Sequence, residues 1–139
     1  MHNLIAHALV KNLKDEILII RRTMIKRGKE NFEGGKWDIP GGTVEELEFP
    51  SVAAEREAKE EVNLDVTVER ILCEKSNIDT KKNKIFTTLI YSCRTVNNSE
   101  NIELDLEEHD DYKWVTKEDI LAMKDDELVS YMRELIQML

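Results

Sequence analysis

The stretch over residues 42–64 constrains this chain most, because its spacing is typical of a helix with two different sides. The pattern there is Gly-x5-Glu-x7-Arg-Glu-Ala-x-Glu-Glu-x-Asn-Leu. We predict a helix over residues 50–62, whose first residue is a proline that suits a first helical turn, where its missing N–H costs nothing. Glu57, Glu60 and Glu61 then fall on one side of that helix. Like charges at this spacing repel by about 0.2 to 0.5 kcal/mol per pair, so we expect a divalent cation beside them.

A second stripe on the same helix consists of small apolar residues. Ala54, Ala58 and Val62 follow one another at four-residue steps, beside the carboxylates. Small side chains allow a helix to pack closely against a sheet. Burying this stripe leaves the carboxylates about a quarter turn away, at the edge of the packed interface. A metal held there would be accessible to substrate.

Length and charge limit the organisation of the chain. With 139 residues, 41% of them hydrophobic, it can bury one core but not two, so we predict a single domain over 1–139. A net charge of −9 argues against stable nucleic-acid binding, which depends on clustered Lys and Arg. The start lacks a basic region followed by an apolar run, and no apolar stretch approaches the roughly 18 residues of a membrane span. We expect a cytoplasmic protein that contacts no membrane.

Hydrophobic periodicity predicts strands on both sides of the helix. Short apolar runs at 4–10 and 17–20 indicate a hairpin, followed by an irregular stretch over 23–36 and a short strand over 37–39. Runs at 64–77 and 84–95 predict two longer strands joined by a polar turn. An acidic loop is expected over 97–111 and a last strand over 112–115.

Helices close the chain. Thr116 to Asp119 has the pattern of a capping box that starts a short helix. A closing amphipathic helix is predicted from Asp125 onward, with its apolar face formed by Leu128, Met132, Leu135 and Leu139. The element order predicts an α+β protein with a mixed β-sheet flanked by helices. Cys73 and Cys93 lie in separate apolar runs without metal-site spacing, so we expect buried thiols.

The helical pattern resembles the signature box of the Nudix (MutT-like) hydrolases, and Trp37-Asp38-Ile39-Pro40-Gly41-Gly42 resembles the usual entry to it. The resemblance implies an α/β/α sandwich. Gly41 and Gly42 permit backbone angles closed to other residues, and we expect them to let a ligand approach closely. The box departs from the family at Asn63, where the family has glycine. Asn accepts the left-handed conformation more readily than other non-glycine residues, so the helix cap should survive.

Carried over by position, the resemblance implies roles for the charged residues of the box. Glu57, Glu60 and Glu61 would bind Mg²⁺ or Mn²⁺, and Glu57 or Glu61 would also activate water. Hard cations prefer such oxygen ligands, which makes zinc an unlikely occupant. Arg56 would orient the carboxylates, a role that its four-residue spacing from Glu60 also permits. Glu48 resembles the first glutamate of the box, which supports the loop.

A further ligand is expected in the acidic loop. Many Nudix sequences have a Glu-His segment before a tryptophan, and its glutamate can act as an additional metal ligand or base. Glu108 is the candidate here, ahead of Trp114. Glu107 is the second choice, and a solvated loop without function is the alternative. We expect His109 to be a neighbour of the site rather than a catalyst.

One basic stretch stands out in this acidic chain. It contains no acid over residues 21–29 and consists of Arg21, Arg22, Lys26, Arg27 and Lys29. Guanidinium groups suit bidentate phosphate contacts, so we expect Arg21, Arg22 or Arg27 to hold a polyphosphate. A solvated loop is the competing interpretation.

Four aromatic residues could stack on a nucleobase, although most large aromatics in a domain of this size belong to the core. They are Phe32, Trp37, Phe86 and Tyr91. His7 alternates with apolar residues and is expected to be a hydrogen-bonded sheet histidine rather than a ligand.

The resemblance implies hydrolysis of a diphosphate bond in a nucleoside diphosphate linked to another group. The expected substrate is a nucleoside triphosphate, natural or modified, cleaved to a monophosphate and pyrophosphate. ADP-ribose, another nucleotide sugar or a dinucleoside polyphosphate is the alternative within the same chemistry. A nucleotide-sensing module without turnover is the alternative of another class, and such a module would be expected to have lost box glutamates that are present here. The sequence leaves monomer and homodimer open.

Overall fold

A mixed β-sheet forms the centre of the computed structural model, which describes residues 2–96 and 101–139. The strands of this sheet are β1 (His2–Lys11), β2 (Ile17–Arg22), β5 (Trp37–Asp38), β6 (Gly41–Thr43), β7 (Val66–Asp79), β8 (Lys84–Thr95) and β9 (His109–Val115). Their order is β5-β2-β1-β8-β7, with β6 also paired to β1 and β9 to β2. β1 and β8 run parallel, and the other pairings in this sheet are antiparallel. The predicted mixed sheet is confirmed.

The expected β1–β2 hairpin is present, but its strands pair only near the connection. Lys11 and Ile17 are in register, and Asn12 N–H donates to the Glu16 carbonyl over 3.1 Å. Toward its start, β1 pairs instead with β6, where His7 lies opposite Gly41. The divergence of β1 and β2 therefore brings the Gly41–Gly42 strand into the middle of the fold.

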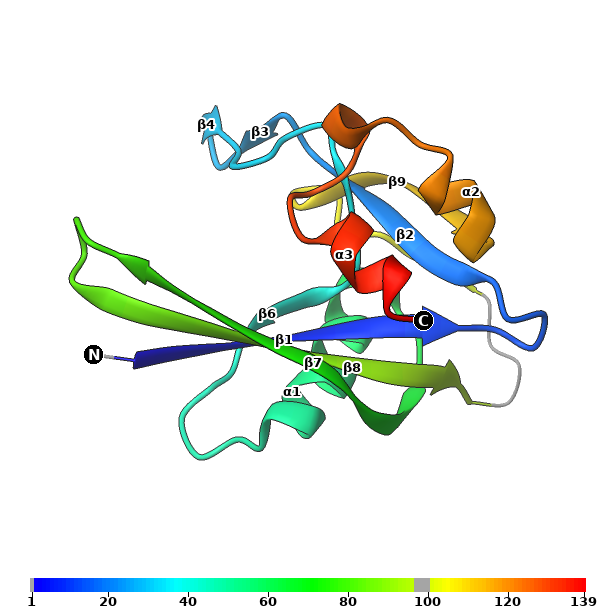
Figure 1. The fold of residues 1–139 in the computed structure, drawn as a ribbon, viewed down its shortest axis with the longest axis horizontal. Coiled ribbons are helices and arrows are strands. Elements are labelled where there is room, and N and C mark those ends of the chain that lie inside the picture. Colours follow the sequence, from blue (N-terminus) through cyan, green and yellow to red (C-terminus); the bar gives the residue numbers. More distant parts are fainter. Residues whose placement is uncertain (1, 97–100) are drawn as a thin grey trace.

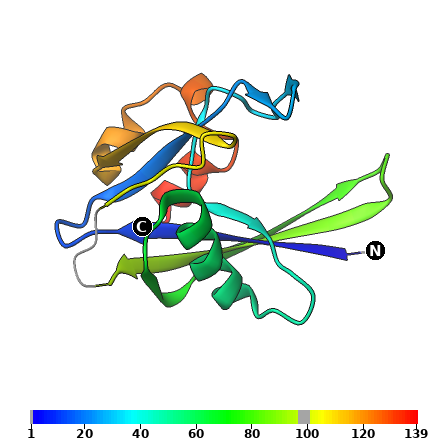
Figure 2. The same cartoon turned by 180° about the vertical axis from the view of Figure 1, so that it is seen from behind.

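The residues of β1 and β2 alternate between two hydrophobic clusters. Ala6, Ala8 and Val10 contribute to a cluster with Ala54, Ala58 and Val62 of helix α1 (Pro50–Val62), all fully buried. Leu9, Ile17 and Ile19 belong to a second cluster with residues from the closing helices. Figures 1 and 2, seen from opposite sides, place α1 on one side of the sheet and α3 on the other. The predicted sandwich is confirmed.

Helix α1 begins and ends where the sequence predicts. Asn63 follows it in the left-handed conformation, with φ 61° and ψ 33°, and its N–H donates to the carbonyls of Ala58 and Lys59. Helix α2 (Lys117–Leu121) starts at Thr116 with the predicted capping box, because the Thr116 side chain accepts from Asp119 N–H and the Asp119 side chain accepts from Thr116 N–H. Both caps are confirmed.

The predicted continuous closing helix is wrong. A 3₁₀ turn, η1 (Asp125–Glu127), precedes a short helix α3 (Met132–Gln137), and the backbone between them leaves the helical path. It does so because Val129 N–H donates to the Trp37 carbonyl over 3.1 Å, and Leu128 forms a bridge with Trp37. Leu128, Met132 and Leu135 are buried and Leu139 partly buried against the same cluster, as the pattern predicted.

Two loop boundaries also differ from the prediction. The stretch over 23–36 contains a small hairpin, β3 (Ile25–Lys26) and β4 (Lys29–Glu30), whose turn has positive φ at Arg27 (53°) and Gly28 (77°). The last strand begins at His109 instead of residue 112, because β9 pairs along β2 as far as Arg22. The first residues of the predicted acidic loop, 97–100, lie outside the described residues.

The cysteines agree with the sequence in part. Both are free thiols, and Cys93 is buried whereas Cys73 is only partly covered. Over residues 2–96 and 101–139, no helix is long and apolar enough to cross a bilayer.

Candidate active site

Arg56 organises the carboxylates of the helix and the loop before it. Its guanidinium donates to both oxygens of Glu48, over 2.8 and 3.0 Å, and to the Thr43 carbonyl over 3.1 Å. The same group donates to Glu57 over 2.9 Å and to Glu60 over 3.1 Å. These carboxylates raise the pKa of Arg56 further above its ordinary value, and Arg56 lowers the pKa of Glu48. Arg56 thus contacts the carboxylates that it is predicted to orient, and Glu48 is one of its partners.

Glu48 also stabilises the turn that precedes α1. Its carboxylate accepts from the Glu45 backbone N–H over 3.0 Å, and its own N–H donates to the Glu45 carbonyl over 3.1 Å. The loop and the helix are thus joined through one carboxylate that also holds Arg56.

Glu57 and Glu61 lie deeper than Glu60 at the sheet side of the helix. Burial raises the pKa of Glu57 against the opposing effect of Arg56. Burial likewise raises the pKa of Glu61, to about 9, although Gly41 N–H donates to its carboxylate over 3.0 Å. The side chain of Glu60 is 56% exposed. Within two turns of α1, the Glu60 carboxylate is therefore exposed to solvent, whereas the Glu57 and Glu61 carboxylates are largely removed from it.

Gly41 and Gly42 are glycines for a different reason from the one expected. Neither has a positive φ, so neither uses the backbone freedom that a glycine permits. Space is the constraint. A Cβ atom on Gly41 would lie 2.3 Å from His7 Nδ1, and one on Gly42 would lie 2.6 Å from Glu57 Oε1. The β6 backbone is packed directly against groups of the site.

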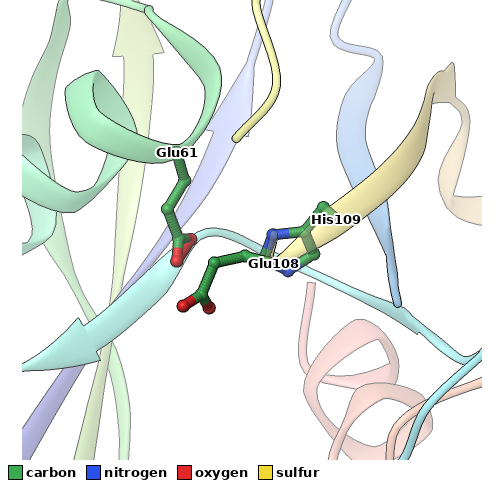
Figure 3. Close-up of side chains that lie close together, drawn as sticks. All are labelled: Glu61, Glu108 and His109. Atoms are coloured by element: carbon green, nitrogen blue, oxygen red, sulfur yellow. The ribbon is translucent and has the colours of Figure 1, made fainter. Parts of the chain in front are cut away.

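Glu108 approaches the helix from the other side of the site. Glu61, Glu108 and His109 each offer a ligand atom, and these atoms lie within 4.8 Å of one another. Figure 3 shows Glu61 projecting from α1 toward Glu108 and His109 at the start of β9. Thus the structure brings Glu108, the expected extra ligand, next to the box carboxylates. Glu57 and Glu60 lie outside this group of three and are held by Arg56.

The donor set fits a divalent cation. It is rich in carboxylate oxygens, as hard cations require. His109 is buried, and its Nδ1 has no hydrogen-bond partner among the described residues. Burial lowers the pKa of His109 to about 4, so the imidazole is neutral near pH 7 and retains a nitrogen lone pair. His109 is therefore a candidate metal ligand, whereas the sequence indicated only a neighbour of the site.

The carboxylates open onto a cavity of about 1280 Å³. Three cations of the basic stretch line it: Arg22, Lys26 and Arg27. Arg21 does not. Its guanidinium pairs with Asp110 over 2.7 Å and lies 5.8 Å from the centre of the Trp37 ring. The structure thus places two of the three predicted polyphosphate arginines at the cavity.

The lining cations differ in how firmly they are held. Arg22 donates to the Phe32 carbonyl over 2.8 Å and to Asn31 Oδ1 and Asp38 Oδ2 over 3.2 Å each. Lys26 pairs with Glu108 over 2.9 Å. Arg22 is consequently a fixed part of the wall, whereas Lys26 has one charged partner.

A group of hydrogen-bonded polar residues in the cavity wall was not predicted from the sequence. Asp38 is 3% exposed and accepts from the Tyr131 hydroxyl, Arg22 and the Ile39 N–H. His7 Nδ1 lies 3.1 Å from the Ile39 carbonyl and 3.3 Å from the Tyr131 hydroxyl, which confirms that His7 is a hydrogen-bonded sheet histidine. A charged residue inside the short strand over 37–39 was the signal for Asp38. Tyr131, which lies about 90 residues downstream, had none.

Of the aromatic candidates, Phe32 alone among the four lines the cavity, with 78% of its surface exposed. Trp37 belongs to the hydrophobic cluster of the closing helices, and Tyr91 packs against the other cluster, which contains the α1 alanines. Tyr131, not considered from the sequence, also lines the cavity.

Comparison with known proteins agrees with this geometry. The NUDIX domain model matches residues 1–139. A MutT protein from Methanosarcina mazei Go1 is 28% identical, with a TM-score of 0.77 over 98% of this chain and 91% of that one. A MutT NUDIX hydrolase from Burkholderia pseudomallei is 23% identical, with a TM-score of 0.73 over 100% and 98% of the chains. An Ap4A hydrolase of C. elegans is 23% identical, with a TM-score of 0.69 over 98% and 93%. No curated protein matched the sequence.

Proposed function

Because the chain belongs to the NUDIX family and is a pyrophosphohydrolase, we propose that it cleaves a nucleoside triphosphate, natural or modified, to a monophosphate and pyrophosphate. The observation that carries the proposal is that one cavity contains both carboxylates and cations of this chain. Carboxylates of α1 and Glu108 line it together with Arg22, Lys26 and Arg27. A chain of phosphates between them would meet cations and, through a divalent ion, carboxylates.

The residues proposed to hold Mg²⁺ or Mn²⁺ are Glu57, Glu60, Glu61 and Glu108. When bound, such an ion favours the deprotonation of water and neutralises charge that develops on phosphoryl oxygens. His109, with its buried and unpartnered Nδ1, is a further candidate donor. Nudix proteins generally use divalent metals, and the oxygen-rich set supports Mg²⁺ or Mn²⁺ in particular.

The protein's own groups would supply position and proton transfer. Arg56 holds Glu57 within 2.9 Å and keeps its carboxylate aimed at the cavity side of α1. Glu57 or Glu61 would accept the proton of the attacking water, and burial raises the pKa of Glu57, which makes its carboxylate a stronger base than an exposed one. Arg22 and Arg27 would hold the phosphates, and Phe32 offers an exposed face for a nucleobase.

Dinucleoside polyphosphates form the second candidate class of substrate. The structural likeness to an Ap4A hydrolase supports including them, as does a cavity large enough for more than a triphosphate. ADP-ribose and other nucleotide sugars share the same diphosphate chemistry.

A panel of nucleoside triphosphates, nucleotide sugars and dinucleoside polyphosphates, assayed with Mg²⁺ and with Mn²⁺, tests the proposal. Identification of the products by phosphorus NMR separates the candidates. Pyrophosphate release supports the nucleoside triphosphate, and ribose phosphate plus AMP supports ADP-ribose. Inorganic phosphate from simple esters, with no diphosphate cleaved, would overturn the proposal.

A further inference from the structure

The Lys26–Glu108 ion pair joins a cation and a carboxylate that line the same cavity. The ammonium and the carboxylate are 2.9 Å apart, and the side chains are 29% and 24% exposed. Glu108 is a proposed metal ligand, and Lys26 is a lining cation of the same cavity. One oxygen of the Glu108 carboxylate is thus paired with the Lys26 ammonium.

The fold places these two side chains opposite each other. Lys26 lies at the end of β3, just before the tight turn at Arg27 and Gly28. The base of that hairpin is fastened to the segment before β9, because Thr23 N–H donates to the Glu108 carbonyl and the Thr23 hydroxyl donates to the Glu107 carbonyl, each over 3.1 Å. The backbones are held together, so a change of partner requires only side-chain rotation.

A divalent ion and an ammonium group compete for Glu108. Two cations within a few ångströms of one carboxylate repel each other, and a second anion beside them offsets that repulsion. A diphosphate is such an anion, and it is the group that the proposed function brings to this cavity.

We propose that Lys26 is a diphosphate-binding residue that changes partner: it pairs with Glu108 in the metal-free protein and with the substrate diphosphate once Glu108 turns to the metal. The inference rests on the proposed function for the identity of the substrate. Its consequence is a positive coupling between metal and diphosphate, since each then favours the arrangement that the other requires.

Lys26→Gln tests this exchange in two titrations that need no turnover. Mn²⁺ binding to the nucleotide-free protein should be about two- to five-fold tighter than in wild type, because Glu108 no longer gives up a partner. Binding of methylenediphosphonate, a non-hydrolysable diphosphate, at saturating Mn²⁺ should be about five-fold weaker or more, because a charge-assisted contact is lost. Lys26→Arg should restore diphosphonate binding.

Arg94→Gln is the matched control. It also removes an ion-paired positive charge, since Arg94 pairs with Asp15 over 2.8 Å, but Arg94 does not line the cavity. The affinities of Arg94→Gln for Mn²⁺ and for methylenediphosphonate should both stay close to those of the wild type. Unchanged or weaker Mn²⁺ binding by Lys26→Gln, or diphosphonate affinity equal to that of Arg94→Gln, would overturn the inference. Absence of hydrolysis by the wild type would instead refute the proposed function.

Discussion

Gly41 and Gly42 are neighbours in one strand, yet an added methyl group would meet different groups at each. At Gly41 the new atom would clash with the His7 ring and come within 2.7 Å of the Ala6 carbonyl, which belongs to the backbone. At Gly42 it would meet the end of the Glu57 side chain, which can move. We therefore expect Gly41→Ala to lower the free energy of unfolding by about 1 to 3 kcal/mol.

The Gly42→Ala variant should have a free energy of unfolding close to that of the wild type. It should lose activity, because the added methyl group displaces Glu57. Urea denaturation and steady-state kinetics on both variants measure the two effects. Equal losses of stability, or full activity in Gly42→Ala, would contradict the contrast.

The pH dependence of stability should reveal Glu61. Burial raises its pKa to about 9 in the folded protein, whereas an exposed glutamate has 4.5. Between pH 4.5 and pH 9, Glu61 is deprotonated in the unfolded chain but still protonated in the folded protein. The contribution of Glu61 to the free energy of unfolding is therefore complete below about pH 4.5 and declines as the pH rises toward 9. The glutamine of Glu61→Gln has no titratable carboxyl, so the free energy of unfolding of this variant lacks that decline.

We expect metal-free Glu61→Gln to gain in stability relative to wild type between about pH 5 and pH 8. The same variant should lose the stabilisation that Mn²⁺ gives the wild type, because a ligand is missing. Urea denaturation in chelator and in Mn²⁺ measures both effects. A stability difference that is the same at both pH values would argue against the desolvated carboxyl.

At the scale of elements, helix α1 combines packing and chemistry on one scaffold. Its buried alanines fix it to the sheet, and its carboxylates lie beside that contact. The helix ends at Asn63, whose φ of 61° costs an alanine about 1 to 2 kcal/mol and a glycine almost nothing.

Asn63→Ala should therefore lower the free energy of unfolding by about 1 kcal/mol, whereas Asn63→Gly should leave it unchanged or raise it slightly. Denaturation midpoints of the two variants provide the measurement. If alanine were as stable as glycine at this position, the left-handed cap would be refuted.

Local patterns predicted most elements well. The α1 bounds, its cap and the Thr116 capping box could be predicted because each depends on residues a few positions apart. The closing helix could not, because the contact that interrupts it joins Leu128 and Val129 to Trp37, far away in the sequence.

At the scale of the whole molecule, the site also contains residues that local patterns indicated and contacts that only the fold creates. Roles for the box glutamates, Arg56 and Glu48 could be proposed from the resemblance to the Nudix box, and a role for Glu108 from the family's Glu-His segment before a tryptophan. The Asp38–Tyr131 contact and the Lys26–Glu108 pair depend on how distant segments meet, so a single sequence held no sign of them. Whether the protein is a homodimer stays a prediction to be measured in solution.

The proposed function requires that the α1 carboxylates take part in metal-dependent diphosphate hydrolysis. The measurement that tests this requirement is the kcat of Glu57→Gln on the best nucleotide substrate, compared with that of Glu55→Gln. Glu55 lies on the same helix but accepts from the Val68 N–H of β7 over 3.1 Å, outside the cavity. We predict a loss of about 100-fold or more for Glu57→Gln and a near wild-type rate for Glu55→Gln. Equal rates for Glu57→Gln and wild type would contradict the account.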